Sequence, residues 1–314
     1  MKDSYERQIK YLRLSVTDLC NYRCIYCMPE DGIEKKQHGD MLSIEELTEI
    51  AKAAYALDIK KIRLTGGEPL VRKGIITLCE NIRAIAPDIE LTLTTNGALL
   101  PDMAESLKAA GVDRLNISID SLDKDSYKKI TRGGDLEKAI KGVKAAEKAG
   151  FDSIKINTVV IGGINVNAIY DFILMTKDFP FQVRFIELMP VGVTKDWDVN
   201  CFVSLTPLET YLQSHAEMQF DGVTRVYRMP EHKGTIGLIS PLSNSFCPRC
   251  DKIRVTADGK LKPCLHSDTE IDLRGLHGDN LIKAIEQGIL DKPFSHSLTA
   301  GGTETMRCMN EIGG

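Results

Sequence analysis

The 314-residue sequence predicts an α/β fold, a partial (β/α)6 barrel of the TIM type with a C-terminal extension. Strand-like apolar runs alternate with amphipathic helical segments six times before about residue 190, and this repetition is typical of a parallel sheet covered by helices. Polar and glycine-rich motifs follow the predicted strands. Ligands bind at that edge of a parallel barrel, so we expect the functional site there.

The expected elements follow in order. We expect strands at 11–16, 61–65, 90–95, 114–118, 153–160 and 182–187, and helices at 44–57, 74–85, 101–110, 136–149 and 166–178. Ser43 and Glu46 form a capping-box pattern that starts the first helix. The repetition stops after residue 190, so we expect a barrel over 1–190 and a C-terminal region over 191–314. Residues 191–246 have mixed polarity with scattered Gly and Pro, and their function is hard to read. A hairpin turning at 257–260 and a partly helical segment over 272–290 follow.

Composition excludes several classes of protein. The net charge is −4 and the pI about 5.9, so no overall positive field attracts nucleic acid. No apolar run approaches the roughly 18 residues that span a bilayer, and residues 1–10 are charged. We therefore expect a cytoplasmic protein with neither nucleic acid nor membrane as a partner. The nine cysteines are an odd number and mostly clustered, which favours metal or cluster binding over disulfides.

Cys20, Cys24 and Cys27 form a CxxxCxxC pattern directly after the first strand. Three thiolates on one loop can hold three irons of a four-iron cluster and leave one iron open for another ligand. The alternative is structural zinc, which needs a fourth ligand that this loop does not supply. The next strand ends in Gly66-Gly67-Glu68-Pro69, whose side-chain-free backbone can approach a ligand closely or simply make a tight βα turn.

A second triplet, Cys247, Cys250 and Cys264, brackets the predicted hairpin. It can hold a second cluster, or zinc with His266 as the fourth ligand. Basic residues also occur in otherwise apolar strands, and a cation inside a barrel needs an anionic partner. That partner is either a polyphosphate or an internal carboxylate, for which the candidates are Glu68, Asp120 and Glu187. The strand cations are Arg13, Arg63 and Lys155.

These motifs carry a resemblance to known proteins. The CxxxCxxC loop with Tyr26 before its third cysteine, followed by the Gly-Gly-Glu-Pro turn, resembles the radical S-adenosylmethionine (radical SAM) superfamily. Within it, the context 63–69, the second triplet with 256–260, and the terminal Gly313-Gly314 resemble the GTP 3′,8-cyclase family. The resemblance covers nearly the whole chain and is weakest over 191–246.

The resemblance implies a radical SAM fold and a lyase that converts GTP to (8S)-3′,8-cyclo-7,8-dihydroguanosine 5′-triphosphate, the first step of molybdenum cofactor biosynthesis. It implies two [4Fe-4S] clusters and S-adenosylmethionine as cofactors. The first triplet would hold the cluster that cleaves S-adenosylmethionine, and the second triplet would hold a cluster that meets the guanine base. Implied partners are a low-potential electron donor of flavodoxin or ferredoxin type, cyclic pyranopterin monophosphate synthase as the next enzyme, and a second copy in a homodimer.

The resemblance also assigns individual residues. The S-adenosylmethionine contacts are Tyr26, Gly67, Ser118 and Met189. The GTP contacts are Arg13, Arg63, Thr94, Lys155, Lys252 and Arg254. Gly313 and Gly314 would reach the active site, where a disordered tail is the alternative. Lys252 stands where the family commonly has arginine, which keeps the charge but loses bidentate geometry. For Tyr26 and Met189 the alternative role is core packing.

Two other functions fit parts of the sequence. A radical SAM enzyme acting on a peptide would also carry extra C-terminal cysteines, but has no evident need for Arg63, Lys155 and the diglycine tail. An electron-transfer or cluster-carrier protein would need the cysteines alone.

Overall fold

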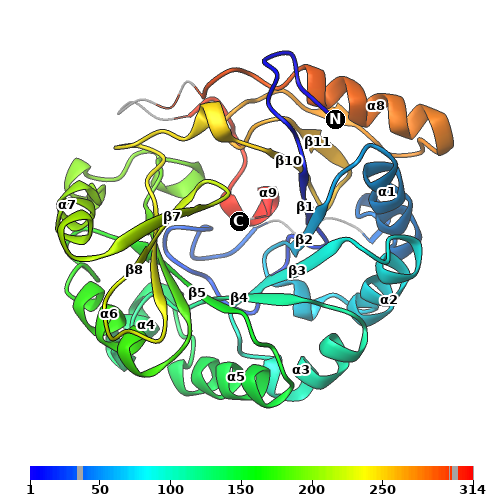
Figure 1. Cartoon of the computed structure of the whole chain (residues 1–314). Helices are drawn as coiled ribbons and strands as arrows, with labels where there is room; N and C mark the ends of the chain where they lie inside the picture. Colours follow the sequence, from blue (N-terminus) through cyan, green and yellow to red (C-terminus); the bar gives the residue numbers. More distant parts are fainter. Residues whose placement is uncertain (34–37, 297, 299–302, 314) are drawn as a thin grey trace.

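The fold is a curled sheet with helices on its outer side (Figure 1). The computed structural model describes residues 1–33, 38–296, 298 and 303–313. Its described strands form one twelve-stranded sheet in the order β12-β11-β10-β1-β2-β3-β4-β5-β6-β9-β8-β7. The strands are β1 Tyr11–Ser15, β2 Lys61–Thr65, β3 Glu90–Thr95, β4 Arg114–Ser118, β5 Ile154–Val160, β6 Gln182–Glu187, β7 Glu217–Asp221, β8 Thr224–Arg228, β9 Thr235–Ile239, β10 Lys252–Val255, β11 Lys260–Lys262 and β12 Ile271–Asp272.

The first six strands confirm the predicted partial barrel. They are neighbours in sequence order and pair in parallel from β1 to β6. Helices connect them and cover the outside of the sheet (Figure 1). The helices of the whole described chain are α1 Ile44–Ala56, α2 Ile75–Ile85, α3 Leu100–Ala109, α4 Lys124–Thr131, α5 Leu136–Lys148, α6 Ala168–Asp178, α7 Thr206–His215, α8 Gly278–Leu290 and α9 Met309–Ile312.

Local signals explain where helices begin. The capping box at α1 is present: the Glu46 amide donates to the Ser43 hydroxyl at 3.1 Å, and the Ser43 amide donates to the Glu46 carboxylate at 2.8 Å. The short helix α4 was not expected, although Asp123 caps it by accepting from the Ser126 amide at 2.8 Å. The connection between β4 and β5 therefore holds two helices, α4 and α5, where one was expected.

The 191–246 region, for which the sequence indicated no strands or helices, has regular structure. That region contains α7, β7, β8 and β9, and β9 pairs in parallel with β6. On the other side, β10 pairs in parallel with β1 and turns into β11, which confirms the predicted hairpin. The sheet is thus continuous across residue 190, and the division into 1–190 and 191–314 stays a prediction about sequence regions.

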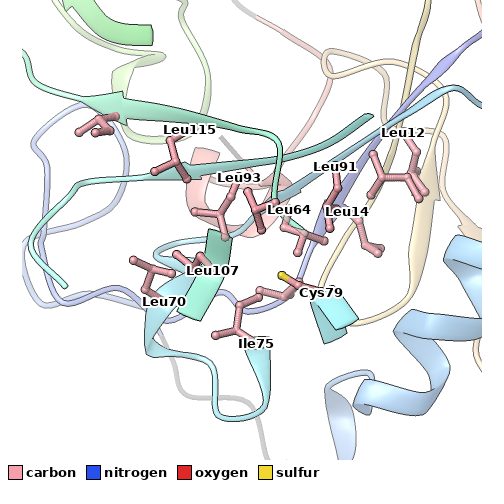
Figure 2. Close-up of a cluster of buried hydrophobic side chains, with 14 of the residues drawn as sticks. Leu12, Leu14, Leu64, Leu70, Ile75, Cys79, Leu91, Leu93, Leu107 and Leu115 are labelled. Carbon is pink, nitrogen blue, oxygen red and sulfur yellow. The ribbon is translucent and has the colours of Figure 1, made fainter. Parts of the chain in front are cut away.

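The apolar core lies between the sheet and its helices. Leu12 and Leu14 of β1 point to this side, where Ile75 and Cys79 of α2 pack among leucines of the neighbouring strands (Figure 2). Cys79 is fully buried there, so it serves as a small apolar side chain. Side chains alternate along a strand, so Tyr11 and Arg13 of β1 face the inside of the barrel instead. The polar side chains of β1 therefore face the barrel interior and not the apolar core.

The C-terminal segment enters that interior. Helix α9 lies near the centre of the ring of strands and helices (Figure 1). In the described part of the chain, no helix is both long and apolar enough to cross a membrane.

Candidate active site

The first cysteine triplet lies on the loop that follows β1. Hydrogen bonds fold this loop tightly: the Cys27 amide donates to the Cys24 carbonyl at 2.9 Å, and the Tyr22 amide donates to the Cys20 sulfur at 3.3 Å. Burial raises the pKa of Cys20 to about 11 and also raises the pKa of Cys24 and Cys27. The bare thiols are therefore protonated at neutral pH, and binding a metal would release their protons.

The Gly66–Pro69 turn supports this loop from the next strand. The Gly67 amide donates to the Thr17 carbonyl at 2.8 Å. A Cβ on Gly67 would lie 2.4 Å from the Leu19 carbonyl oxygen, and one on Gly66 would lie 2.3 Å from that of Thr17. Neither position has room for a side chain. Both glycines also line the central cavity, so the turn is at once a tight connection and part of the cavity wall.

A cavity of about 560 Å³ occupies the barrel interior, and both cysteine triplets line it. The loop after β1 and the region around the β10–β11 hairpin therefore face the same space. Other predicted contact residues in the lining are Tyr26, Gly67, Ser118, Met189, Arg13, Arg63, Thr94, Lys252 and Arg254. Lys155 and Gly313 do not belong to that lining.

The second triplet reaches the cavity through the pairing of β10 with β1, which sets Lys252 beside Tyr11. The hairpin then returns the chain to Cys264, on the cavity wall with Cys247 and Cys250. Burial acts to raise the pKa of Cys247, but its hydrogen bonds with His296 and Ser245 lower it to about 7. A thiol that ionises readily suits a metal ligand.

The geometry of the thiols bears on which metal group fits. Among residues 1–33, 38–296, 298 and 303–313, no group of three or more His, Cys, Asp or Glu side chains is placed to hold a single ion. His266, the expected fourth zinc ligand, is buried with its ring 4.9 Å from that of His296. A four-iron cluster distributes its thiolates around a larger body than one zinc ion. Both triplets supply three thiols to the wall of one cavity.

Three arginines stand side by side inside the barrel. The register pairs Arg13 of β1 with Arg63 of β2 on one side and with Arg254 of β10 on the other. Arg63 and Arg254 are each 7% exposed. Burial, and then Arg254, lowers the pKa of Arg13 well below its usual value. Like charges on adjacent strands repel one another, and a bound anion would offset part of that repulsion in this arginine row.

Glu68, Asp120 and Glu187, the carboxylates considered as alternative internal partners of the strand cations, have other hydrogen-bond donors around them. Each accepts from amides and hydroxyls that hold loops at the strand ends. Burial raises the pKa of Glu68 to about 7 and that of Asp120 to about 6 against these hydrogen bonds. The donors are Thr95 and Asn96 for Glu68, Tyr26 and Val159 for Asp120, and Leu205, Leu242 and Ser243 for Glu187.

Lys155 does form an internal ion pair, but with a residue that the sequence did not indicate. Its ammonium contacts the carboxylate of Asp221 at the end of β7, and Arg184 of β6 donates to the same carboxylate at 2.6 Å. Burial, and then the charge of Arg184, lowers the pKa of Lys155 to about 7. Lys155 borders a second hollow of about 340 Å³, and Asp221 lines both hollows.

The residues assigned to S-adenosylmethionine lie at strand ends around the first triplet. Tyr26 donates its hydroxyl to Asp120 at 2.8 Å and packs against a small apolar cluster that includes Leu188. The Met189 carbonyl accepts from the Thr194 hydroxyl at 2.6 Å. Tyr26 therefore both packs against this cluster and lines the cavity. Thr94, assigned to GTP, has a buried hydroxyl without a hydrogen-bond partner in the described chain, and it faces the same cavity.

The end of the chain lies against the arginine row. Gly313 is buried, and its carbonyl accepts from Arg254 at 3.4 Å. Its φ is +80°, and a Cβ there would lie 2.5 Å from the Thr65 hydroxyl. Only glycine suits both constraints. Gly314 lies outside the described residues. Met309, at the start of α9, lines the cavity directly.

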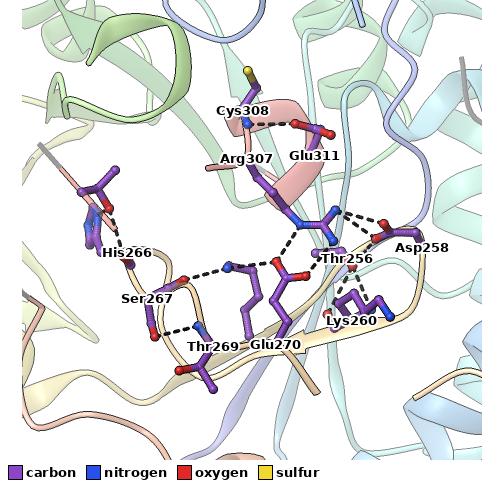
Figure 3. A network of polar contacts seen from close by, with 12 residues as sticks. Thr256, Asp258, Lys260, His266, Ser267, Thr269, Glu270, Arg307, Cys308 and Glu311 are labelled. Atoms are coloured by element: carbon purple, nitrogen blue, oxygen red, sulfur yellow. Dashed lines mark hydrogen bonds and ion pairs between the residues drawn. The ribbon is translucent and has the colours of Figure 1, made fainter. Parts of the chain in front are cut away.

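An ionic network holds this segment in place (Figure 3). Arg307 contacts Asp258 at 3.0 Å in the β10–β11 turn and Glu270 at 2.7 Å just before β12. Glu270 also contacts the fully buried ammonium of Lys262 at 3.2 Å. Arg307 therefore connects the C-terminal segment to the same hairpin that carries the second cysteine triplet.

The variant Arg307→Gln should release the C-terminal segment. Loss of its charged hydrogen bonds is expected to speed amide hydrogen exchange in 303–313 by at least about tenfold, because such bonds each contribute more than a neutral one. Lys260→Gln is the matched control, since it removes an exposed pair with Asp272 from the same hairpin. Hydrogen exchange with mass spectrometry measures both; equal exchange in the two variants would contradict the anchoring role.

The sequence-based analysis missed several polar residues in the cavity lining, among them Arg184, Asp221 and Asn157. Arg184 carried the same signal as Arg63, a cation in an otherwise apolar strand, and could have been found. Asp221 lies on an exposed edge hairpin and had no local signal. Its importance follows only from the two cations that it contacts.

Comparison with known proteins shows the family of the chain. Residues 14–175 match the radical SAM superfamily, and residues 181–298 match the family Molybdenum Cofactor Synthesis C. The chain is 47% identical over 328 residues to GTP 3′,8-cyclase of Alkaliphilus oremlandii (strain OhILAs), and 48% identical over 320 residues to that of Alkaliphilus metalliredigens (strain QYMF). Both matches cover 100% of each chain.

A solved structure supports the fold. Native anSMEcpe with bound AdoMet has a TM-score of 0.62 at 19% identity, over 92% of this chain and 82% of that one. The sequence matches extend over both parts of the chain, and the family models meet near the end of the predicted barrel. The chain therefore belongs to the radical SAM superfamily and, within it, to the family of GTP 3′,8-cyclases.

Proposed function

We propose that this protein is a radical SAM lyase that converts GTP to (8S)-3′,8-cyclo-7,8-dihydroguanosine 5′-triphosphate, the first step of molybdenum cofactor biosynthesis. The observation that carries the proposal is the row of Arg254, Arg13 and Arg63 in a cavity lined by two cysteine triplets. A triphosphate offsets such a row, and arginine binds phosphate through paired N–H groups. The two relatives named GTP 3′,8-cyclase, which match over their full length, support this reaction.

Cys20, Cys24 and Cys27 would hold a [4Fe-4S] cluster with one open iron, where S-adenosylmethionine binds. When bound, this pair supplies a one-electron cleavage of S-adenosylmethionine and a radical that abstracts hydrogen from C3′ of the GTP ribose. The chain contributes the binding site. Tyr26, with its ring held through Asp120, can pack on adenine, and the Gly67 backbone, Ser118 and Met189 complete the S-adenosylmethionine contacts.

Cys247, Cys250 and Cys264 would hold a second [4Fe-4S] cluster whose open iron meets the guanine base. The fit rests on three thiols of one cavity wall and on the low pKa of Cys247, caused by His296 and Ser245. The base would then be held at the second triplet while the ribose faces the first. Positioning of this kind lets C3′ and C8 of one nucleotide react with each other.

The phosphate contacts complete the placement of GTP. The arginine row, Thr94 and Lys252 line the cavity and can bind the triphosphate. Arg184 is a further candidate, since it shares the carboxylate of Asp221 with Lys155. Lys155 would bind the substrate only if a phosphate replaces the Asp221 carboxylate as its partner. Gly313 and Gly314 would close the site, because a side-chain-free end fits beside Arg254 without filling the cavity.

One experiment tests the reaction directly. Anaerobic incubation of cluster-loaded protein with GTP, S-adenosylmethionine and a reductant should yield the cyclic nucleotide, identified by mass spectrometry, and 5′-deoxyadenosine. Iron analysis should give close to eight irons per chain, as two four-iron clusters require. The peptide-modifying alternative is not favoured by the full-length relatives, and an electron carrier would form no nucleotide product.

The second cluster has its own prediction. Cys250→Ala should lose formation of the cyclic nucleotide, because the base is no longer held, while the first triplet still supports cleavage of S-adenosylmethionine. Separate assays of 5′-deoxyadenosine and of the nucleotide measure the two steps. Unchanged nucleotide yield would refute a substrate-binding second cluster.

The cellular setting follows from the reaction. We propose a low-potential donor of flavodoxin or ferredoxin type, transfer of the product to cyclic pyranopterin monophosphate synthase, and action in the cytoplasm as a homodimer. We also propose that residues 1–190 supply the radical chemistry and residues 191–314 the second cluster and the tail.

A further inference from the structure

Tyr11 holds an unusual place in the barrel interior. It lies one layer below the arginine row, where the register sets it between Lys61 of β2 and Lys252 of β10. On β10, β1 and β2, the upper row is Arg254, Arg13 and Arg63, and the lower row is Lys252, Tyr11 and Lys61. The neutral residue in the lower layer is a tyrosine.

The contacts of Tyr11 are with these cations. The nitrogens of Lys61 and Lys252 and the guanidinium carbon of Arg63 each lie 5.3 Å from the centre of its ring. A ring at this distance attracts cations and keeps them apart. Tyr11 is 6% exposed and lines the central cavity.

Its hydroxyl is left without a hydrogen bond. In the described chain the buried Tyr11 oxygen has no hydrogen-bond partner. A buried hydroxyl without a partner destabilises a protein, so such a group at a cavity wall indicates a ligand. The surrounding cations, with Arg63 and Arg13 foremost, lower the pKa of Tyr11 against the effect of burial, which makes the O–H a stronger donor.

We infer that the Tyr11 hydroxyl donates a hydrogen bond to a phosphate oxygen of the bound nucleoside triphosphate, while its ring spaces the cations that bind the same chain of phosphates. Tyr11 is then a substrate-binding residue in addition to the basic ones. The inference rests on the proposed function for the identity of the nucleotide. The contact itself requires only a polyphosphate in the cavity.

The variant Tyr11→Phe tests this contact, because it keeps the ring and removes the hydroxyl alone. Equilibrium dialysis of cluster-loaded protein should show GTP and inorganic tripolyphosphate bound about tenfold or more weakly, as expected for losing a hydrogen bond to a charged group. Guanosine should bind as it does to the unchanged protein. Stability without ligand should stay the same or rise, since an unsatisfied group is removed.

Tyr127→Phe is the matched control. Tyr127 is 1% exposed, packs edge-on against Tyr22, and is not part of the cavity lining, so its variant should bind all three ligands normally. Unchanged tripolyphosphate binding by Tyr11→Phe, an equal loss for guanosine, or no tripolyphosphate binding by the unchanged protein would each overturn the inference. Tyr11-dependent binding without cyclic nucleotide formation would refute the proposed reaction and leave the contact standing.

Discussion

Replacing Cys24 by alanine is expected to reduce the cleavage of S-adenosylmethionine to the level of a protein-free control. Cys24 is the middle ligand of the first triplet and is fixed by the turn in which its carbonyl accepts from the Cys27 amide. With two thiolates left, the loop cannot hold three irons and keep a fourth one open. The measurement is 5′-deoxyadenosine formed from S-adenosylmethionine and a reductant, with and without GTP.

Cys201→Ser is the matched control for this experiment. Cys201 is half-buried in the 191–246 region and does not line the cavity, so the variant should form 5′-deoxyadenosine normally. Iron content should fall by about half in Cys24→Ala only, because the second triplet is untouched. Formation of 5′-deoxyadenosine by Cys24→Ala at the normal rate would remove the first triplet from the mechanism.

The central strands and the position of the first triplet could be predicted from local pattern alone. Each of the strands β1 to β6 is a short apolar run beside a helix of clear period, and parallel βα units are joined by short right-handed connections. The cysteine loop and the Gly66–Pro69 turn follow adjacent strands, so their contact follows from topology. The bond from the Gly67 amide to the Thr17 carbonyl confirms it.

The 191–246 region could not be read in the same way. Strand β7 is exposed along most of its length and lies at the edge of the sheet, so it lacks the apolar signal of a buried strand. Strand β9 is buried but short and contains Gly237, which weakens its pattern. Pairing with the distant strand β6 determines its structure, and the sequence around β9 does not indicate that pairing.

The arrangement of charges was predicted only in part. That Arg13 and Arg63 lie in strands follows from local sequence, but that Arg254 joins them depends on the parallel pairing of β10 with β1, about 240 residues away. The pairing of Lys155 with Asp221 likewise depends on the β7–β8 hairpin. Sequence therefore indicated the cations, while the sheet register determined which of them act together.

The position of Arg13 between two other arginines leads us to predict the effect of its replacement on both GTP binding and stability. Arg13→Met should weaken GTP binding roughly 30-fold or more, because the centre of the row loses its contact with phosphate. The free energy of unfolding without ligand should stay the same or rise by about 1 kcal/mol, because the variant removes a charge flanked by Arg63 and Arg254. Equilibrium dialysis and denaturant unfolding measure the two quantities.

Arg83→Met should behave in the opposite way. Arg83 lies on α2 outside the barrel, and its guanidinium donates to the carbonyls of Pro87 and Gly111 and to the Asp113 carboxylate at 2.6 to 2.7 Å. Its loss should lower the free energy of unfolding and leave GTP affinity unchanged. Replacing an arginine that stabilises the fold should thus lower the free energy of unfolding, whereas replacing one that binds substrate should not. If Arg13→Met instead lowers stability and keeps normal GTP affinity, the row is structural and the phosphate site lies elsewhere.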